Sequence, residues 1–195
     1  QLTIDRLKNK YSDQISDKDK ENFKEYLKII IKQINQIENL VNEFSDFARM
    51  PKPILINNNI VQLIKDNIKL LKEVDKSIII DLKNENQKII LNSDNEQINR
   101  VFFNLIKNSI ESIQQKAEKN DNFSKKVTIE ITENDEHISI DIIDNGIGFE
   151  AFKNNIKDIL NPYFTTKKNG TGLGLSIVNK IISDHNGTLK FIPIS

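Results

Sequence analysis

The chain has 195 residues, of which 37% are hydrophobic and 29% are charged, a balance typical of a folded globular protein. Its 28 basic and 28 acidic residues cancel, so no net field indicates binding to nucleic acid. The absence of cysteine excludes disulfides and thiolate metal sites, and no apolar run approaches the ~20 residues that span a bilayer.

The first fifty residues are predicted to form two helices. Leu2, Leu7 and Tyr11 mark the apolar points of the first helix, and Ser16 or Asp17 can cap the second by accepting from its first-turn amides. Apolar residues in the second helix are spaced alternately four and three apart. This heptad seam predicts facing helices, and the alternative is a helix docked on its own domain. The seam consists of Phe23, Leu27, Ile30, Ile34, Ile37, Val41, Phe44 and Ala48.

Two prolines end this helical region. Pro51 and Pro53 remove backbone donors and restrict the residues before them, so the second helix must end near Arg49. We therefore expect a partial helical hairpin at 1–50, a stiff linker at 51–53 and a second domain at 54–195.

The second domain alternates between strand and helix patterns. Its predicted strands are 54–56, 77–82, 88–91, 127–132, 137–143 and 188–192, the 127–143 pair turning at Asn134-Asp135. Its predicted helices are one capped by Asn58 or Asn59, one from Asp94 or Asn95 to about Lys119, and one at about 172–185. Because the last apolar strand has no successor with which to pair, we expect the sequence to be a piece of a longer protein, truncated at both ends.

Asn104 and Asn108 lie four residues apart on the long predicted helix, and therefore on one helical face. An amide oxygen is a neutral, hard ligand of the kind that Mg²⁺ accepts. Taken alone, the pair is equally typical of two solvated or capping asparagines.

A second segment, Asp144-Asn145-Gly146-Ile147-Gly148-Phe149, follows a predicted strand. The Asp144 carboxylate can accept from an exocyclic amino group such as that of adenine. Gly146 and Gly148 permit backbone angles and close approaches that a Cβ would obstruct. The alternative, a calcium-binding turn, lacks the series of oxygen ligands found in an EF-hand loop.

Two further segments are Pro162-Tyr163-Phe164-Thr165-Thr166-Lys167-Lys168 and Gly170-Thr171-Gly172-Leu173-Gly174-Leu175. The second leads directly into a predicted helix, whose N-terminal amides and dipole favour an anion. It is neither a Walker motif nor a Rossmann fingerprint that follows a strand, so the usual nucleotide-binding folds do not fit.

In this order and spacing, the four segments resemble the N, G1, F and G2 boxes of histidine kinases, over about residues 95–192. The resemblance implies an α+β chain: a helical hairpin that is half of a dimeric four-helix bundle, then a Bergerat-type α/β sandwich that binds ATP under a mobile lid. Residues 44–51 are similar to the end of the second helix in nitrogen-regulation sensor kinases, and residues 1–11 to the stretch after their phospho-acceptor box.

The resemblance also assigns roles to residues. Asn108 would chelate Mg²⁺, Asn104 would support the phosphate site, Lys167 of the lid would neutralise phosphate charge, and Asp144 would bind the adenine amino group. The other nucleotide-binding residues that it implies are Gly146, Gly148, Phe164, Thr165, Thr166, Gly170, Thr171, Gly172, Leu173, Gly174 and Leu175.

ATPases that share this fold resemble one another in having a Glu one turn before the metal-binding Asn, where it activates water as a general base. Here that position is Asn104, which cannot take a proton. An Asn in place of this Glu favours transfer of the ATP γ-phosphoryl to a protein histidine, for relay to the receiver domain of a response regulator.

Two departures from the family pattern matter. No histidine precedes His137, so the acceptor is missing and this fragment alone is not expected to autophosphorylate. Glu111 stands where many relatives have a basic phosphate contact, and His137 and His185 are expected to have structural roles.

We expect a cytoplasmic homodimer, without nucleic-acid or direct membrane contact in this segment. The alternative is a non-catalytic dimerising scaffold with a vestigial nucleotide site.

Overall fold

The computed structural model describes residues 2–11, 16–83, 87–120, 122–134, 136–148, 156–165, 167 and 170–193. They belong to two compact units: a helical unit of residues 1–50 with 167–171, and an α/β unit of residues 51–166 with 172–195. The helical unit contains α1 (Leu2–Tyr11) and α2 (Asp17–Ala48). The α/β unit contains β1 (Ile56–Asn59), α3 (Ile60–Lys72), β2 (Ile79–Leu82), β3 (Ile90–Ser93), α4 (Asn95–Lys119), β4 (Lys126–Glu133), β5 (Ile138–Asp144), the 3-10 helix η2 (Ile156–Leu160) and α5 (Gly174–Asp184).

In the helical unit, α2 begins and ends where the sequence predicted. Ser16 is its N-cap residue, but the Ser16 hydroxyl donates to the Asp19 carboxylate at 2.6 Å and makes no capping bond to a backbone amide. The predicted cap is therefore right in position and wrong in bonding. At the other end, the Arg49 N–H donates to the Ser45 carbonyl at 3.0 Å, and the helix stops before Pro51.

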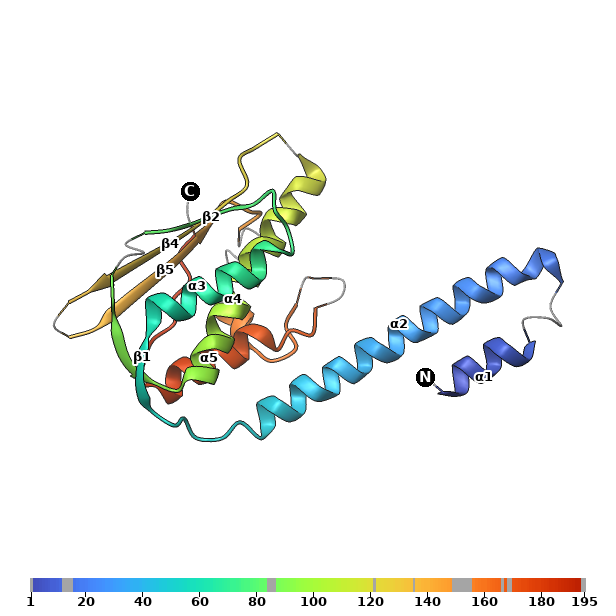
Figure 1. Ribbon diagram of the computed structural model, residues 1–195, viewed down its shortest axis with the longest axis horizontal. Helices are drawn as coiled ribbons and strands as arrows, with labels where there is room; N and C mark the ends of the chain where they lie inside the picture. Colours follow the sequence, from blue (N-terminus) through green and yellow to red (C-terminus); the bar gives the residue numbers. More distant parts are fainter. Residues whose placement is uncertain are drawn as a thin grey trace. The chain divides into compact units, whose positions relative to one another are not determined.

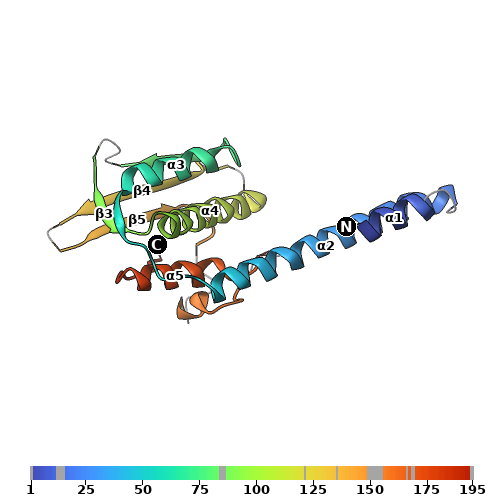
Figure 2. The same ribbon diagram turned by 60° about the horizontal axis from the view of Figure 1, so that its bottom comes forward.

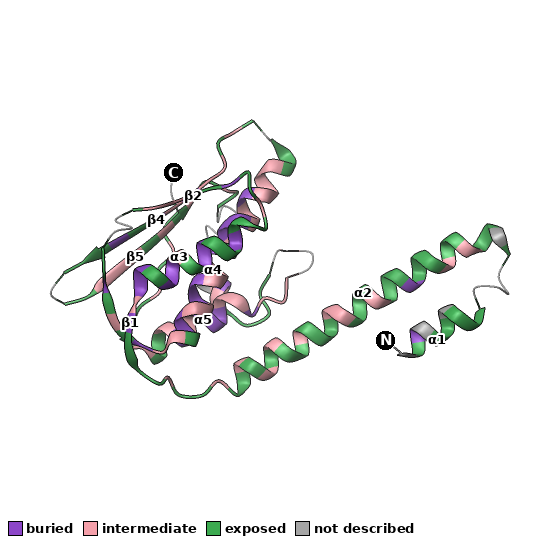
Figure 3. Cartoon of the chain, viewed as in Figure 1, coloured by how far each residue is buried: buried purple, intermediate pink, exposed green. Residues whose placement is uncertain are grey.

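The heptad seam of α2 is covered only near its start. Leu27 is 7% exposed, and Ile4 of α1 is similarly buried. Further along, Ile37 is 61% exposed and Val41 is 56% exposed, and α2 is coloured largely as exposed in Figure 3. The helical unit thus presents an apolar stripe that its own described residues leave open. None of the described helices is long and apolar enough to cross a membrane.

The main sheet of the α/β unit has the order β2-β4-β5, with β2 parallel and β5 antiparallel to β4 (Figure 1). A separate antiparallel pair joins β1 to β3. Alternate residues of β4 are buried: Val127, Ile129 and Ile131 all point to one face. The register places Asp144 opposite Val127, so the last side chain of β5 lies on the same face.

Three helices form the second layer against that face. Helix α3 contacts β2 and α4, and α4 contacts β4, β5 and α5 (Figure 2). Their apolar residues recur at helical spacing, and Ile64, Ile106, Ile113 and Ile181 are fully buried between the layers. The α/β unit therefore has the two-layer α/β architecture that the resemblance implied, with α4 at the centre of the helical layer.

The start of α4 joins three segments. One Asp94 carboxylate oxygen accepts from the Gln97 N–H at 3.0 Å, which is the predicted N-cap, and the other accepts from the Ile54 N–H at 2.8 Å. The Asp94 N–H donates to the His185 Nε2 at 3.0 Å, and the Gln97 side chain donates to the Pro51 carbonyl. Burial raises the pKa of Asp94, but backbone donors and His185 outweigh it, so the net pKa is lowered.

Several predicted boundaries were wrong. The strand predicted at 54–56 begins at Ile56, because the Ile54 N–H is bonded to Asp94 and does not join a ladder. The strand predicted at 88–91 is found at Ile90–Ser93. The N-cap of α3 is Asn59, yet neither Asn58 nor Asn59 makes a side-chain capping bond. Asn58 instead donates to the Ser93 carbonyl at 2.7 Å.

The strand predicted at 188–192 is absent: the described residues there belong to no ladder. Leu189 and Phe191 are half-buried while Lys190 is exposed, so the alternation that suggested a strand is real. Alternation reports burial of one side, however, and a strand also needs a paired neighbour. In the predicted turn, Asp135 lies outside the described residues, whereas the Asn134 side chain accepts from the Glu136 and His137 amides.

Candidate functional site

The site is built along one face of α4. Asn104, Asn108 and Ser112 follow one another at intervals of four residues, each about 6 Å further along the helix. The Asn104 side-chain nitrogen donates to the Arg100 carbonyl at 2.9 Å, which fixes the amide and leaves its oxygen as the outward group. A Cβ added at Gly174 would lie 3.4 Å from this oxygen. The first residue of α5 therefore lies against Asn104.

At the other end of this face, the loop after β5 lies directly on α4. A Cβ at Gly146 would lie 2.5 Å from the Ser112 carbonyl carbon and 2.7 Å from the Ile113 nitrogen, and nearer still to the Ser112 hydroxyl. The Ile147 N–H also donates to the Ser112 carbonyl at 3.3 Å. Only glycine fits so close to a helix backbone, so this position requires Gly146 for a steric reason.

Asn145 holds the loop in place with all of its polar groups. Its N–H donates to the Lys126 carbonyl at 3.3 Å, and its side-chain oxygen accepts from the Lys126 N–H at 3.0 Å. Its side-chain nitrogen donates to the Ser124 carbonyl, and its own carbonyl accepts from the Lys116 ammonium at 2.7 Å. Lys116 also lies 4.7 Å from the centre of the Phe123 ring. The loop is therefore tied both to the start of β4 and to α4.

These ties position Asp144. The residue is half-buried on the helix-facing side of the sheet, and its Oδ1 accepts from the Gly146 N–H at 3.0 Å. Gly148 has a φ of +65°, in the left-handed region that favours glycine, although a Cβ there would meet nothing within 4 Å. Gly146 thus serves close approach, and Gly148 serves backbone conformation.

The segment that leads into α5 is also set by a glycine. Gly172 has a φ of +72°, and a Cβ there would lie 2.7 Å from the Phe164 nitrogen, with the Tyr163 backbone closer still. The Tyr163 N–H donates to the Gly172 carbonyl at 3.1 Å. Leu173 as a whole is 0% exposed, and its side chain anchors the helix start in the core. Leu173 therefore has no exposed atom to offer a ligand, contrary to its predicted nucleotide-binding role, whereas Leu175 is half-buried.

The remaining residues of the expected site are placed as follows. Phe164 and Thr165 are exposed, and Thr166 lies outside the described residues. Lys167, Gly170 and Thr171 belong to the helical unit, where the Thr171 hydroxyl donates to the Glu43 carboxylate at 2.5 Å. The structure thus brings together, along α4, the two asparagines, the loop from Asp144 to Gly148 and the segment from Gly172 to Leu175.

Sequence reasoning missed three residues of this arrangement: Ser112, Lys116 and Asn145. Ser112 and Lys116 continue the four-residue spacing of Asn104 and Asn108, a signal that would have placed them on the same face. No local pattern predicts the four hydrogen bonds of Asn145, because its partners come from distant parts of the chain.

Other expectations concern charge. The Lys107 ammonium lies 3.9 Å from the carboxylate of the half-buried Glu111, an i,i+4 pair, so the acidic residue at this position has a local partner. His185 is bound between Asp94 and the Ile181 carbonyl, and His137 lies in the β4–β5 turn beside Asn134. The bonds of His185 fit the structural role that was expected of it, and among the described residues the exposed His137 contacts only its own turn.

Residues 93–193 match the family described as histidine kinase-, DNA gyrase B-, and HSP90-like ATPase. The chain is similar to a putative sensor histidine kinase NtrY-like of Rickettsia felis, with 36% identity over 96% of this chain and 30% of the relative. It is 32% identical to the nitrogen regulation protein NtrY of Azorhizobium caulinodans, over 97% of this chain and 24% of that protein. The chain therefore spans less than a third of the length of these relatives.

Solved structures agree with the fold. The catalytic domain of the histidine kinase ThkA is similar with a TM-score of 0.54 and 29% identity, over 68% of this chain and 82% of that chain. ThkA in complex with the response regulator protein TrrA has a TM-score of 0.65 at 23% identity, over 95% of this chain and 51% of that chain. The architecture, the geometry along α4 and the match over 93–193 lead to one conclusion: the chain belongs to the histidine kinase-, DNA gyrase B- and HSP90-like ATPase family, in which NtrY-like sensor histidine kinases are its relatives.

Proposed function

We propose that this chain is the ATP-binding catalytic region of a sensor histidine kinase, which transfers the ATP γ-phosphoryl to a protein histidine for relay to a response regulator. One observation carries the proposal. A single face of α4 has the Asp144 loop against Ser112 at one end and the start of α5 against Asn104 at the other. The two ends lie about 12 Å apart along the helix, so they would contact different parts of one nucleotide.

The chemistry at the two ends differs in the way that a nucleotide requires. Asp144 offers a carboxylate, an acceptor for the adenine amino group, beside a loop that hydrogen bonds tie to β4 and α4. The start of α5 offers backbone N–H groups and the positive end of a helix dipole, which favour phosphate. Gly174 leaves open the space beside Asn104 that a side chain would fill.

The same face fits a magnesium ion. Asn108 and Asn104 supply side-chain amide oxygens, the hard neutral donors that Mg²⁺ accepts together with phosphate oxygens. The bond from Asn104 to Arg100 turns the amide nitrogen away, so that the oxygen faces Gly174. Bound Mg²⁺ would neutralise phosphate charge. We assign Asn108 as its protein ligand and Asn104 as the support of the phosphate site.

Asn104 also bears on the reaction type. A carboxamide cannot act as the general base that activates water, and this one is held by its own helix. The site therefore favours phosphoryl transfer to a bound nucleophile, in which positioning and charge neutralisation dominate. We assign Lys167, with Phe164, Thr165 and Thr166, to a lid over the phosphates.

The helical hairpin at 1–50, joined by the linker at 51–53 to a catalytic domain at 54–195, would supply the dimer. Its exposed stripe, which includes Ile37 and Val41, has the heptad spacing of facing helices. The partner receiving the phosphoryl group would be a response regulator receiver domain, since the relative ThkA has been solved in complex with TrrA. We place the reaction in the cytoplasm.

Calorimetric titration with a non-hydrolysable ATP analogue, with and without Mg²⁺, tests the site. We expect Mg²⁺-dependent binding that Asn108→Ala weakens by at least tenfold, with Asn92→Ala, an exposed asparagine of β3, unchanged. A scaffold with a vestigial site would show no binding. Labelled ATP should leave no acid-labile phosphate on the chain alone, because neither histidine lies in 1–50. Such a label would contradict the proposed acceptor.

A further inference from the structure

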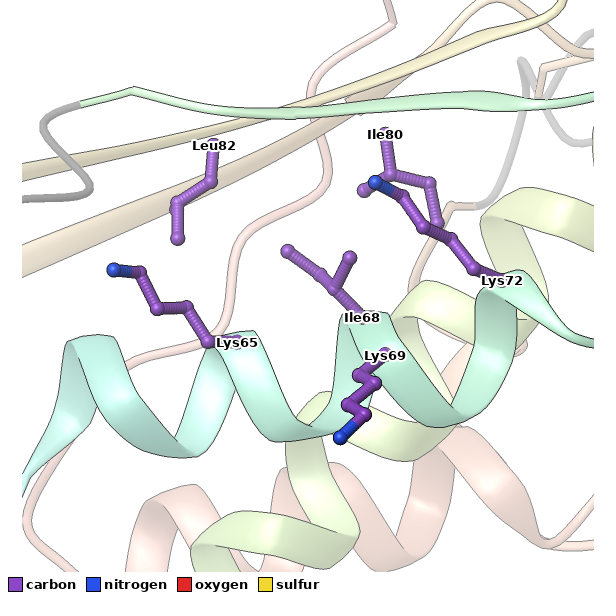
Figure 4. A pocket seen from close by; sticks show the side chains of 6 residues that line it. All are labelled: Lys65, Ile68, Lys69, Lys72, Ile80 and Leu82. Carbon is purple, nitrogen blue, oxygen red and sulfur yellow. The ribbon is translucent and has the colours of Figure 1, made fainter.

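A hollow of about 280 Å³ lies between α3 and β2, apart from the face of α4 described above. Its floor is apolar: Ile68 of α3 and Ile80 and Leu82 of β2. Lys65 and Lys72 project from α3 on either side of Ile68, toward β2 (Figure 4). Lys69 also lines the hollow, but its ammonium points away from β2, so the hollow is an apolar depression with two cations directed toward the strand.

Strand β2 lies at the edge of the sheet, pairing only with β4 among the described residues. The Ile79 N–H donates to the Lys125 carbonyl, and the Lys83 N–H to the Ile129 carbonyl. Because the backbone groups of successive strand residues point to alternate sides, those of residues 80 and 82 point away from β4. An edge of this kind is a template for a further strand.

The charge beside this edge is uncompensated. Lys65, Lys69 and Lys72 form one stripe of α3, and none has an ion pair in the part of the chain that the structure describes. Asp81 of β2 forms its ion pairs with other lysines: its carboxylate lies 2.9 Å from the Lys83 ammonium and 3.3 Å from that of Lys126. The edge therefore offers positive charge with no acid of its own to neutralise it.

A strand added beyond β2 would lie about 4.8 Å outward, and alternate side chains would project over the hollow toward α3. Lys65 and Lys72 are seven residues apart, which is about 10.5 Å along a helix. Residues i and i+4 of a strand are about 13 Å apart, a match within the reach of flexible lysines. An apolar residue at i+2 would then lie over Ile68.

We propose that this edge binds an extended acidic segment of a partner protein by strand addition to β2. The segment has the pattern acidic-x-apolar-x-acidic: its apolar side chain fills the hollow, and its two carboxylates contact Lys65 and Lys72. Main-chain hydrogen bonds to residues 80 and 82 supply affinity, and the hollow and the lysines supply specificity. This interaction is independent of the nucleotide site.

The probe is a fluorescein-labelled peptide, Thr-Glu-Thr-Ile-Thr-Glu-Thr, titrated against the whole chain by fluorescence anisotropy. We expect saturable binding, with the amides of Ile80 and Leu82 gaining protection from hydrogen exchange. Lys65→Glu/Lys72→Glu should weaken binding by roughly tenfold. Lys119→Glu/Lys190→Glu, two exposed lysines elsewhere, should leave it unchanged. Circular dichroism confirms that both variants fold.

Three results would overturn the proposal. Equal binding of a peptide with Ser in place of Ile would show attraction by charge alone. Equal binding of a peptide that is N-methylated along its pairing edge would exclude strand addition. Lysine-dependent binding to phosphatidylglycerol vesicles, with none to the peptide, would indicate a lipid surface in place of a protein partner.

Discussion

Replacing Gly146 by alanine tests the close approach of the Asp144 loop to α4. The added Cβ would lie 2.5 Å and 2.7 Å from backbone atoms of Ser112 and Ile113, which belong to the 25-residue helix α4 and lie well before its end at Lys119. Overpacking of this kind costs about 1–3 kcal/mol. Because the loop is the softer partner, we expect it to shift and to carry Asp144 with it.

Nucleotide binding requires Asp144 to return to its place, and this restores the strain of about 1–3 kcal/mol. That free energy corresponds to a roughly 5- to 150-fold loss of nucleotide affinity, measured with a fluorescent ATP analogue. Gly187→Ala is the control, since its Cβ would press on the Ile182 side chain at 2.9 Å, at the far end of α5. Adding Ser112→Ala to Gly146→Ala should restore little, because the backbone contacts remain. Affinity of Gly146→Ala within twofold of the wild type, or its rescue by Ser112→Ala, would refute the steric argument.

The remaining predictions concern the start of α5, the start of α4 and the seam of α2. Gly172→Ala combines a φ of +72° with a backbone collision at Tyr163, so it should lower both the melting temperature and nucleotide affinity; unchanged affinity would contradict this. The lowered pKa of Asp94 means that its charge stabilises the fold above the unfolded pKa of about 3.9, a contribution lost as pH falls through the folded pKa. Asp94→Asn should thus cost about 0.3–1 kcal/mol in urea unfolding at pH 7, and the cost should vanish at acid pH; a cost independent of pH would be inconsistent. Ile37→Glu/Val41→Glu should shift sedimentation from dimer to monomer, and a wild-type monomer would count against the seam.

The periodicity of the sequence predicted most of the helices and strands, and it placed several residues of the candidate site on them. The four-residue spacing of Asn104 and Asn108 predicted a shared helical face, and α4 confirms it. The position of Asp144 at a strand end was also readable, although its orientation toward α4 required the register with Val127. These features depend on residues that are close together in the sequence, so the sequence pattern alone predicts them.

Features that depend on residues distant in the sequence could not be predicted from the sequence. Asn145 looks like any turn asparagine, yet its bonds reach α4 and the start of β4. Ile54 has a strand pattern, but a carboxylate forty residues later takes its N–H. Residues 188–192 alternate as a strand does and pair with no ladder among the described residues.

The most direct test asks whether the metal of a bound nucleotide lies at Asn108. Mn²⁺, which accepts the same oxygen ligands, would replace Mg²⁺ with a non-hydrolysable ATP analogue, and side-chain amide signals would be followed by NMR. We expect the Asn108 signal to broaden beyond detection at a Mn²⁺ level that leaves Asn95 visible, because Asn95 lies about 20 Å earlier along α4. A sharp Asn108 signal at saturating Mn²⁺ and nucleotide would contradict the account.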